Sequence, residues 1–147
     1  MKIDRHKYLK SLTASLLSAQ KHKIVKSKTW AKDFPPKPGV YIIRKKDKLI
    51  YVGETGSIKG RLKDLCSTRN HTARRSIGTE QFRKHAEYTK PSSKDRFCDT
   101  IEDLLNQYFA KNLTITFLEV DLGRKELEEI ICKNHIPIHN IKTIRKS

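Results

Sequence analysis

The chain has 147 residues, which suits a single domain, and its 32 lysines and arginines against 16 acidic residues give a formal net charge of +16. No apolar run approaches the roughly 18 residues of a membrane span, the first residues lack the apolar stretch of a secretory signal, and three scattered cysteines argue against a disulfide scaffold or a zinc site. We therefore expect a cytoplasmic protein without a membrane partner. So much positive charge favours a polyanionic partner such as nucleic acid, and the alternative is a lysine-rich surface that only aids solubility.

Residues 8–20 carry leucines at steps of three and four, which predicts an amphipathic helix. A basic stretch at 21–28 and a proline-rich segment at 34–39 follow it. We expect residues 1–34 to form an N-terminal helical extension laid on a main domain of residues 35–147. A helical arm that contacts the partner is the alternative.

Two short β-rich runs, 40–44 and 49–52, predict a hairpin across the polar residues between them. A loop of four residues pairs Arg44 with Leu49 and puts Tyr41 and Tyr51 on opposite faces. A loop of three residues sets Tyr41 opposite Tyr51 and places Asp47 where a left-handed backbone is tolerated. We favour the three-residue loop.

The remainder of the sequence predicts helices with one further strand. A helix capped by Ser57 runs to residue 66, residues 67–77 form a basic loop, a short helix follows at 79–87, and a longer one spans 99–112. Residues 114–120 read as a strand buried on both sides, and a last helix runs from Gly123 to about residue 134. The fold class is thus α+β, with a small three-stranded antiparallel sheet flanked by helices.

The last helix brings acidic side chains to the domain. Its apolar side predicts that Glu129 points away from the core, whereas Glu126 and Glu128 lie on the two flanks. One flanking carboxylate can face a cleft beside the sheet. With two hairpin tyrosines and Arg61 it would form a site suited to a phosphodiester, because a guanidinium and a divalent cation both neutralise charge on phosphate oxygens. Mg²⁺ needs only one or two protein carboxylates, so one glutamate is enough.

Five elements of the sequence resemble those of the GIY-YIG nucleases. Gly39-Val40-Tyr41 is similar to the GIY element and Tyr51-Val52-Gly53 to the YIG element; Arg61 follows the second tyrosine by ten residues. Glu128 lies twelve residues before Asn140, which follows a proline by three. The resemblance covers about residues 38–66 and 122–140.

This resemblance implies one-metal hydrolysis of double-stranded DNA with Mg²⁺ or Mn²⁺. It assigns Glu128 to the metal, Arg61 to the scissile phosphate, Tyr41 to activating or orienting water, and Tyr51 to positioning. Gly39, Gly53 and Asn140 would be structural. It leaves restriction, mobile-element or repair roles open, and also the oligomeric state, for which a homodimer would explain cutting of both strands.

One departure concerns the position a helical turn beyond the arginine, where many members have His or Tyr and this chain has Leu65. We expect His71 to supply the missing catalytic group, with an exposed loop histidine as the alternative. Arg69, Arg74 and Arg75 are expected to hold the DNA backbone. The basic runs 21–28, 44–48 and 142–146 contact DNA or are only solvated faces. For the whole chain, the alternative is a non-catalytic DNA-binding module.

Overall fold

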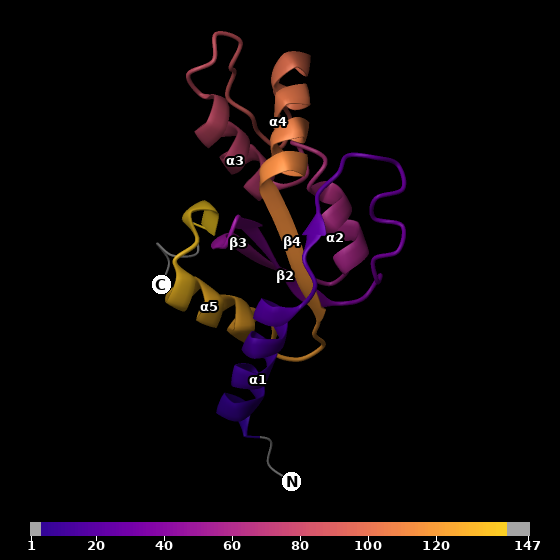
Figure 1. Cartoon of the computed structure of the whole chain (residues 1–147), viewed down its shortest axis with the longest axis vertical. Helices are drawn as coiled ribbons and strands as arrows, with labels where there is room; N and C mark the ends of the chain where they lie inside the picture. The colour runs from indigo at the N-terminus through magenta and orange to yellow at the C-terminus, as the bar shows by residue number, and fades with distance from the viewer. Residues whose placement is uncertain (1–3, 141–147) are drawn as a thin grey trace.

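The computed structural model describes residues 4–140 and contains a four-stranded antiparallel sheet with helices on both faces (Figure 1). The elements in chain order are α1 (Arg5–Ser18), β1 (His22–Lys23), β2 (Gly39–Lys45), β3 (Lys48–Thr55), α2 (Ile58–Asp64), α3 (Thr72–Phe82), α4 (Asp99–Asn112), β4 (Leu113–Glu119), α5 (Arg124–His135) and the 3₁₀ helix η1 (Ile138–Asn140). The strand order is β1-β4-β2-β3. The α+β class is confirmed, and the short β1 strand is added to the three strands that were predicted. No helix within residues 4–140 is long and apolar enough to span a bilayer.

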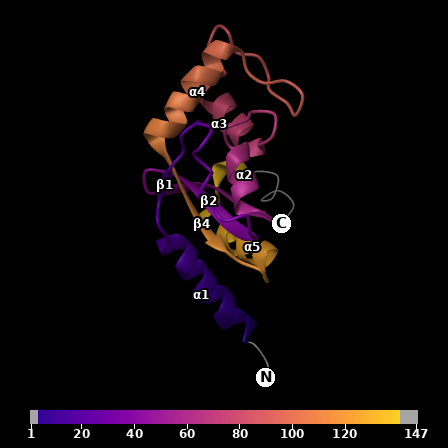
Figure 2. The same cartoon turned by 90° about the vertical axis from the view of Figure 1, so that its right-hand side faces the viewer.

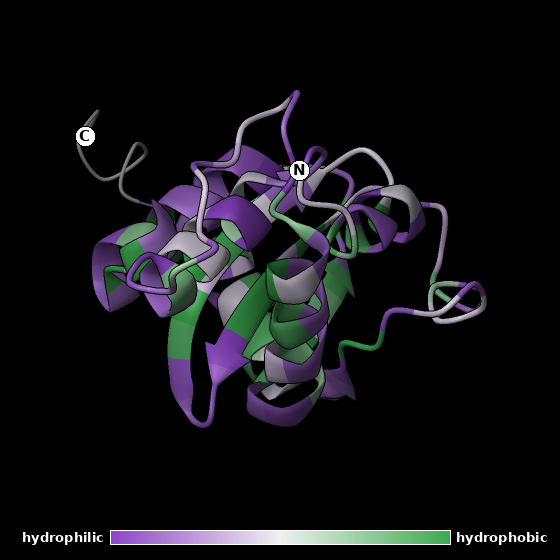
Figure 3. Ribbon diagram, turned by 90° about the horizontal axis from the view of Figure 1, so that it is seen from above, coloured by the Kyte–Doolittle hydropathy of each residue, from purple (hydrophilic) through white to green (hydrophobic). Residues whose placement is uncertain are grey.

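The two faces of the sheet carry separate hydrophobic cores. On one face, α1 and α5 pack against β2, β3 and β4 through Leu16, Ile42, Val52, Leu127 and Ile131. The opposite face is covered by α2, α3 and α4. Figures 1 and 2 show α1 at one end of the molecule and α3 and α4 at the other. In Figure 3 the strands are largely coloured hydrophobic, whereas hydrophobic and hydrophilic residues alternate along the helices. The expected boundary at residue 34 stays a prediction, although His22 and Lys23 already belong to the sheet.

The hairpin register differs from the one we favoured. Its turn contains two residues, and Lys46 rather than Asp47 takes the left-handed conformation, with φ 55°. Arg44 pairs with Leu49, but an irregularity then shifts the register so that Ile43 lies opposite Tyr51 and Tyr41 opposite Gly53. The two tyrosines consequently share one face, as diagonal neighbours, because the extra residue restores the alternation that the shorter turn would have reversed.

The helix expected at 79–87 begins earlier, at Thr72, within the segment expected to be a loop. His71 is its N-cap, and its ring accepts a hydrogen bond from the Ala73 amide. Two polar side chains that would mark a loop, His71 and Arg74, are buried in this structure, at 0% and 1% exposed. The sequence therefore did not predict the first part of this helix, because its buried side includes polar residues of types that usually face water.

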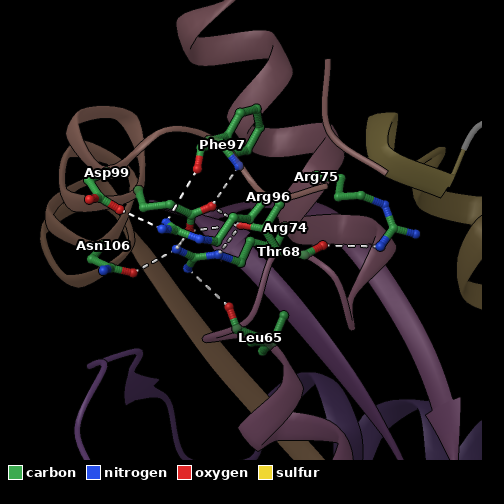
Figure 4. Close-up of polar contacts among 9 residues, drawn as sticks. Leu65, Thr68, Arg74, Arg75, Arg96, Phe97, Asp99 and Asn106 are labelled. Carbon is green, nitrogen blue, oxygen red and sulfur yellow. Dashed lines mark hydrogen bonds and ion pairs between the residues drawn. The ribbon is translucent and has the colours of Figure 1, made fainter. Parts of the chain in front are cut away.

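Arg74 is held in a buried polar network that joins α2, α3 and α4 (Figure 4). Its guanidinium donates to Glu102 at 2.9 Å, to Asn106 at 2.7 Å and to the Leu65 carbonyl at 3.2 Å, and its Nε donates to Thr68 at 3.0 Å. Burial alone would raise the pKa of Glu102, but hydrogen bonds from Thr68 and Arg74 bring it below its usual value. Arg74 lies in the core and not on the surface. It therefore stabilises the fold and does not contact the DNA backbone, as we had expected it to.

We predict that Arg74→Gln lowers the free energy of unfolding by about 3–5 kcal/mol, because it leaves Glu102 buried without its counter-ion. The matched control is Arg69→Gln, a substitution of an exposed arginine nearby, which should change stability by less than about 0.5 kcal/mol. Urea unfolding followed by circular dichroism measures both. Equal stability of the two variants would contradict the structural role of the ion pair.

Two glycines of the hairpin permit close packing that a side chain would block. A Cβ on Gly39 would collide with Ile58 and the Leu118 carbonyl oxygen. A Cβ on Gly53 would lie 2.6 Å from Cζ and Oη of Tyr41, whose ring crosses this glycine from the neighbouring strand. The position of the Tyr41 hydroxyl thus depends on the absence of a side chain at residue 53.

We predict that Gly53→Ala displaces Tyr41 and costs about 1–3 kcal/mol of stability through overpacking. Gly56→Ala is the matched control, because a Cβ there meets no atom within 4 Å. It should be neutral or stabilising by up to about 1 kcal/mol. Thermal unfolding of both variants makes the comparison, and a Gly53→Ala protein as stable as the control would show that the ring adjusts freely.

Candidate active site

The hydroxyl of Tyr41 is buried and lies next to His71. The residue is 1% exposed, and its Oη lies 2.7 Å from Nε2 of His71. The Tyr41 and Tyr51 ring centroids are 6.0 Å apart, and the His71 ring lies 5.5 Å from that of Tyr51. Strands β2 and β3 and the start of α3 therefore bring three aromatic rings together.

The contacts of His71 fix its protonation. Its Nδ1 accepts a hydrogen bond from the Ala73 amide at 3.1 Å, so Nε2 carries the ring proton and donates to the Tyr41 oxygen. Burial lowers the pKa of His71 well below its ordinary value, and the charges of Arg61 and Arg75 lower it further. His71 is a neutral hydrogen-bond donor and has no lone pair left to take a proton from Tyr41.

Both tyrosines are neutral at neutral pH. Burial raises the pKa of Tyr41 well above its usual value, Tyr51 raises it further, and Arg61 opposes the effect. Burial also raises the pKa of Tyr51, with a smaller contribution from Glu128. These phenols can orient a ligand by hydrogen bonding, but they do not carry a standing negative charge.

Arg61 projects from α2 beside the tyrosines. Its Nη1 donates to the Asn70 carbonyl at 2.8 Å and approaches the Asp64 carboxylate at 3.4 Å. The side chain is 30% exposed. One edge of the guanidinium is thus held by protein, while other N–H groups remain for an anion.

Glu128 completes the site from α5, next to the β3 edge. Its neighbours divide as the helical pattern predicted: Glu129 is exposed, and Glu126 lies near Arg5 of α1 at 3.5 Å. Burial, together with the nearby carboxylate of Glu54, raises the pKa of Glu128. Glu54 is neutralised by Arg124 at 3.2 Å, whereas no ion pair to Glu128 is found within residues 4–140.

The residues around Glu128 fit a divalent cation that keeps most of its water. No three His, Cys, Asp or Glu side chains in the described part of the chain cluster closely enough to enclose a metal. A half-buried carboxylate of raised pKa, to which no described residue forms an ion pair, nevertheless gains from binding a cation. Magnesium suits such a site, since waters and phosphate oxygens can fill its other positions.

Asn140 joins η1 to the edge strand β3. Its Oδ1 accepts from the Val52 amide at 2.9 Å, and its Nδ2 donates to the Val52 carbonyl at 2.8 Å. This pairing satisfies backbone groups of β3 between Tyr51 and Gly53. His139 adds a hydrogen bond of 2.7 Å to Ser76 of α3. Residues 136–140 therefore hold β3 and α3 in place around the aromatic rings.

The arginines expected to contact DNA occupy three different environments. Arg69 is exposed, Arg74 is buried, and Arg75 is half-buried, with its guanidinium donating to the Thr68 and Arg69 carbonyls. Arg74 takes no part in a DNA-binding surface. The basic run at 142–146 lies outside the described residues.

Sequence reasoning did not identify Glu54 or its partner Arg124. Glu54 lies two residues beyond Val52, which packs on the α5 face, so strand alternation would have placed its carboxylate toward α5. Arg124 follows Gly123 at the start of that helix. The contact between Arg61 and the Asn70 backbone carbonyl could not be predicted from the sequence, because contacts to the backbone depend on loop geometry.

Comparison with known proteins places this site in a family. A family model described as the GIY-YIG catalytic domain matches residues 19–146, whereas no curated protein sequence matches the chain. Solved structures of the GIY-YIG N-terminal endonuclease domain of UvrC from Thermotoga maritima are similar in fold. A point mutant bound to the catalytic divalent cation is 15% identical, covers 88% of this chain and 94% of that one, and gives a TM-score of 0.42. The magnesium-bound domain is 18% identical, covers 88% and 96%, and gives 0.40.

The family match extends over most of the sequence. It includes both hairpin tyrosines, Arg61, Glu128 and Asn140. The chain therefore belongs to the GIY-YIG family of nuclease domains.

Proposed function

We propose that this protein is a metal-dependent endonuclease that hydrolyses phosphodiester bonds in double-stranded DNA, with Mg²⁺ or Mn²⁺ as its cofactor. One observation supports the proposal. The Arg61 guanidinium, the neutral phenols of Tyr41 and Tyr51, and the Glu128 carboxylate, which has no ion pair within residues 4–140, lie close to one another. Water attacks phosphorus, the bond to the leaving oxygen breaks, and no protein atom joins the phosphate.

Each side chain has a role that follows from its contacts. Arg61 binds the scissile phosphate with the N–H groups that Asn70 and Asp64 do not occupy. Tyr41, which accepts a hydrogen bond from His71, directs its own proton toward the substrate or the attacking water. Tyr51 lies beside it as a second positioning group. Glu128 holds the cation, which when bound supplies positive charge to the phosphate oxygens.

Arg69, on the segment that leads into α3, and Arg75, within α3, lie beside this site and serve as contacts to the DNA backbone. Arg69 is exposed, and Arg75 keeps part of its surface open to solvent. Such contacts position the DNA without reading its sequence. His71 acts as a positioning residue, because its ring touches Tyr41 and is buried away from solvent.

We predict that Glu128→Ala reduces plasmid cleavage by about 1,000-fold or more, because the cation loses its protein ligand. DNA affinity should remain, since the basic surface is unchanged. Cleavage of supercoiled plasmid is measured with Mg²⁺ and with a chelator, and affinity by fluorescence anisotropy.

Glu129→Ala is the matched control, because Glu129 is the adjacent, exposed carboxylate. It should cleave like the parent protein. Absence of any nicking by the parent protein under Mg²⁺ or Mn²⁺ would favour a DNA-binding module, and full activity of Glu128→Ala would remove Glu128 as the metal ligand.

We predict that His71→Asn lowers the cleavage rate by about 10²-fold through misplacement of Tyr41. Asparagine also caps helices well, so α3 should still form. Because His71 stays neutral as a donor, the pH dependence of the rate between pH 6 and 8 should keep its shape. A rate step near the ordinary histidine pKa in the parent protein, absent from His71→Asn, would instead identify His71 as a base.

A further inference from the structure

A groove on the other side of α2 lies outside the catalytic machinery described above. It is bounded by residues 26–32, α2, the segment 66–70 and the first half of α4, and its volume is about 1290 Å³. Pockets for small ligands usually span about 300–1,000 Å³. None of Tyr41, Tyr51, His71 and Glu128 lines it. Its size therefore suits a segment of a polymer better than a small molecule.

One wall of the groove is strongly basic. Its cations come from the 26–32 segment, from α2 and from the loop after it: Lys26, Lys28, Lys32, Lys59, Lys63 and Arg69. All six are exposed, and none forms an ion pair with an acidic residue among residues 4–140. A row of solvated cations on one wall binds a polyanion by releasing its counterions.

The opposite wall, at the start of α4, has a different chemistry. Asp99 pairs with Arg96 at 2.6 Å and Glu102 with Arg74 at 2.9 Å, which leaves Asp103 as an acid without an ion pair within the described residues. Asn106 accepts from Arg74 through Oδ1, so the amide NH₂ is what it can offer to the groove. This wall would repel phosphates, but it can hydrogen-bond to base edges.

Trp30 adds an aromatic surface to the groove. It is the chain's single tryptophan and it lines the groove. Its indole N–H already donates to the Lys23 carbonyl at 2.8 Å and its ring packs in a T-shaped arrangement against Phe34, so only the part of the ring that lines the groove can contact a ligand. Aromatic rings beside a basic track are how proteins bind single-stranded nucleic acid, because unpaired bases stack on them.

We propose that this groove binds an unpaired strand of DNA that flanks the cleaved phosphate. The inference rests on the proposed nuclease function and adds the class of DNA: a substrate with a single-stranded segment beside the scissile bond. The lysines would contact the backbone, while Asp103, Asn106 and Trp30 face the bases. A duplex fits less well, because it presents phosphates of two strands and keeps its bases stacked inside.

The groove is connected to the site through Arg61. Asp64 and Asn70 line its rim, and both bind the Arg61 guanidinium, at 3.4 and 2.8 Å. A strand whose phosphate lies on Arg61 can thus continue past α2 into the groove. This continuity sets the direction in which the unpaired segment would leave the cleaved bond.

The test measures binding in a chelator, so that no cleavage occurs. An oligothymidylate of about 12 nucleotides is titrated against a blunt duplex of the same length. We expect the single strand to bind more tightly, by anisotropy of a labelled oligonucleotide, and to quench the fluorescence of Trp30. In the variant Lys26→Gln/Lys28→Gln/Lys59→Gln/Lys63→Gln, affinity should fall by about tenfold or more, and the salt slope by about 0.7 for each lysine that contacts a phosphate.

The matched control is Lys10→Gln/Lys111→Gln, which removes exposed lysines elsewhere on the molecule, and it should change affinity by less than the groove variant for each charge removed. All these lysines are exposed, so circular dichroism should show folded proteins. Tighter binding of the duplex, unquenched Trp30 in the bound protein, or groove and control variants of equal affinity would overturn the inference.

Cleavage assays separate this result from the proposed function. If the single strand binds in the groove but no metal supports cleavage, the nuclease proposal fails while the binding site stands. If plasmid is cut but the groove variant binds and cuts single-strand-flanked substrates as the parent does, the groove inference fails alone.

Discussion

The buried ion pair of Arg74 and Glu102 anchors the first turn of α3 to α4, and the candidate active site depends on the position of that turn. Arg74 also binds Thr68 and the Leu65 carbonyl, so the pair fixes the whole connection from α2 to α3. This connection presents the Asn70 carbonyl to Arg61 and His71 to Tyr41. A buried ion pair is a costly way to gain stability, because both charges lose their water. Here it holds two groups that contact residues of the candidate active site.

The elements with regular periodicity could be predicted from sequence. The helix at 99–112 has the predicted bounds, Ser57 caps α2, and the flank positions of Glu126 and Glu128 follow from the leucine and isoleucines beside them. These patterns succeed because one side of each helix faces an apolar core and the other faces water. The order of the site residues along the chain also carried the family resemblance that the domain match confirmed.

What could not be predicted depends on long-range polar contacts and on local backbone geometry. The start of α3, at Thr72 instead of the predicted Thr79, was missed because the buried face of its first turns includes an arginine whose partner lies 28 residues away. The predicted hairpin register was wrong. A two-residue turn combined with an irregularity at Arg44 puts both tyrosines on one face, as the three-residue loop that we favoured also would, so the sequence pattern does not distinguish the two. Leu65, where family members often have a polar group, is core, and His71 reaches Tyr41 from the α3 cap.

In the proposed reaction the divalent cation and the substrate phosphate have opposite charges, so the binding of one affects the binding of the other. Glu128 is one carboxylate in a chain of net charge +16, and its neighbour Glu54 is already paired with Arg124. One glutamate binds a divalent cation weakly unless other oxygens complete the shell, and the substrate phosphate supplies them. The phosphate in turn gains from the cation, so each ligand strengthens the binding of the other by the same factor. Under this proposal the cation is held firmly only when DNA is bound.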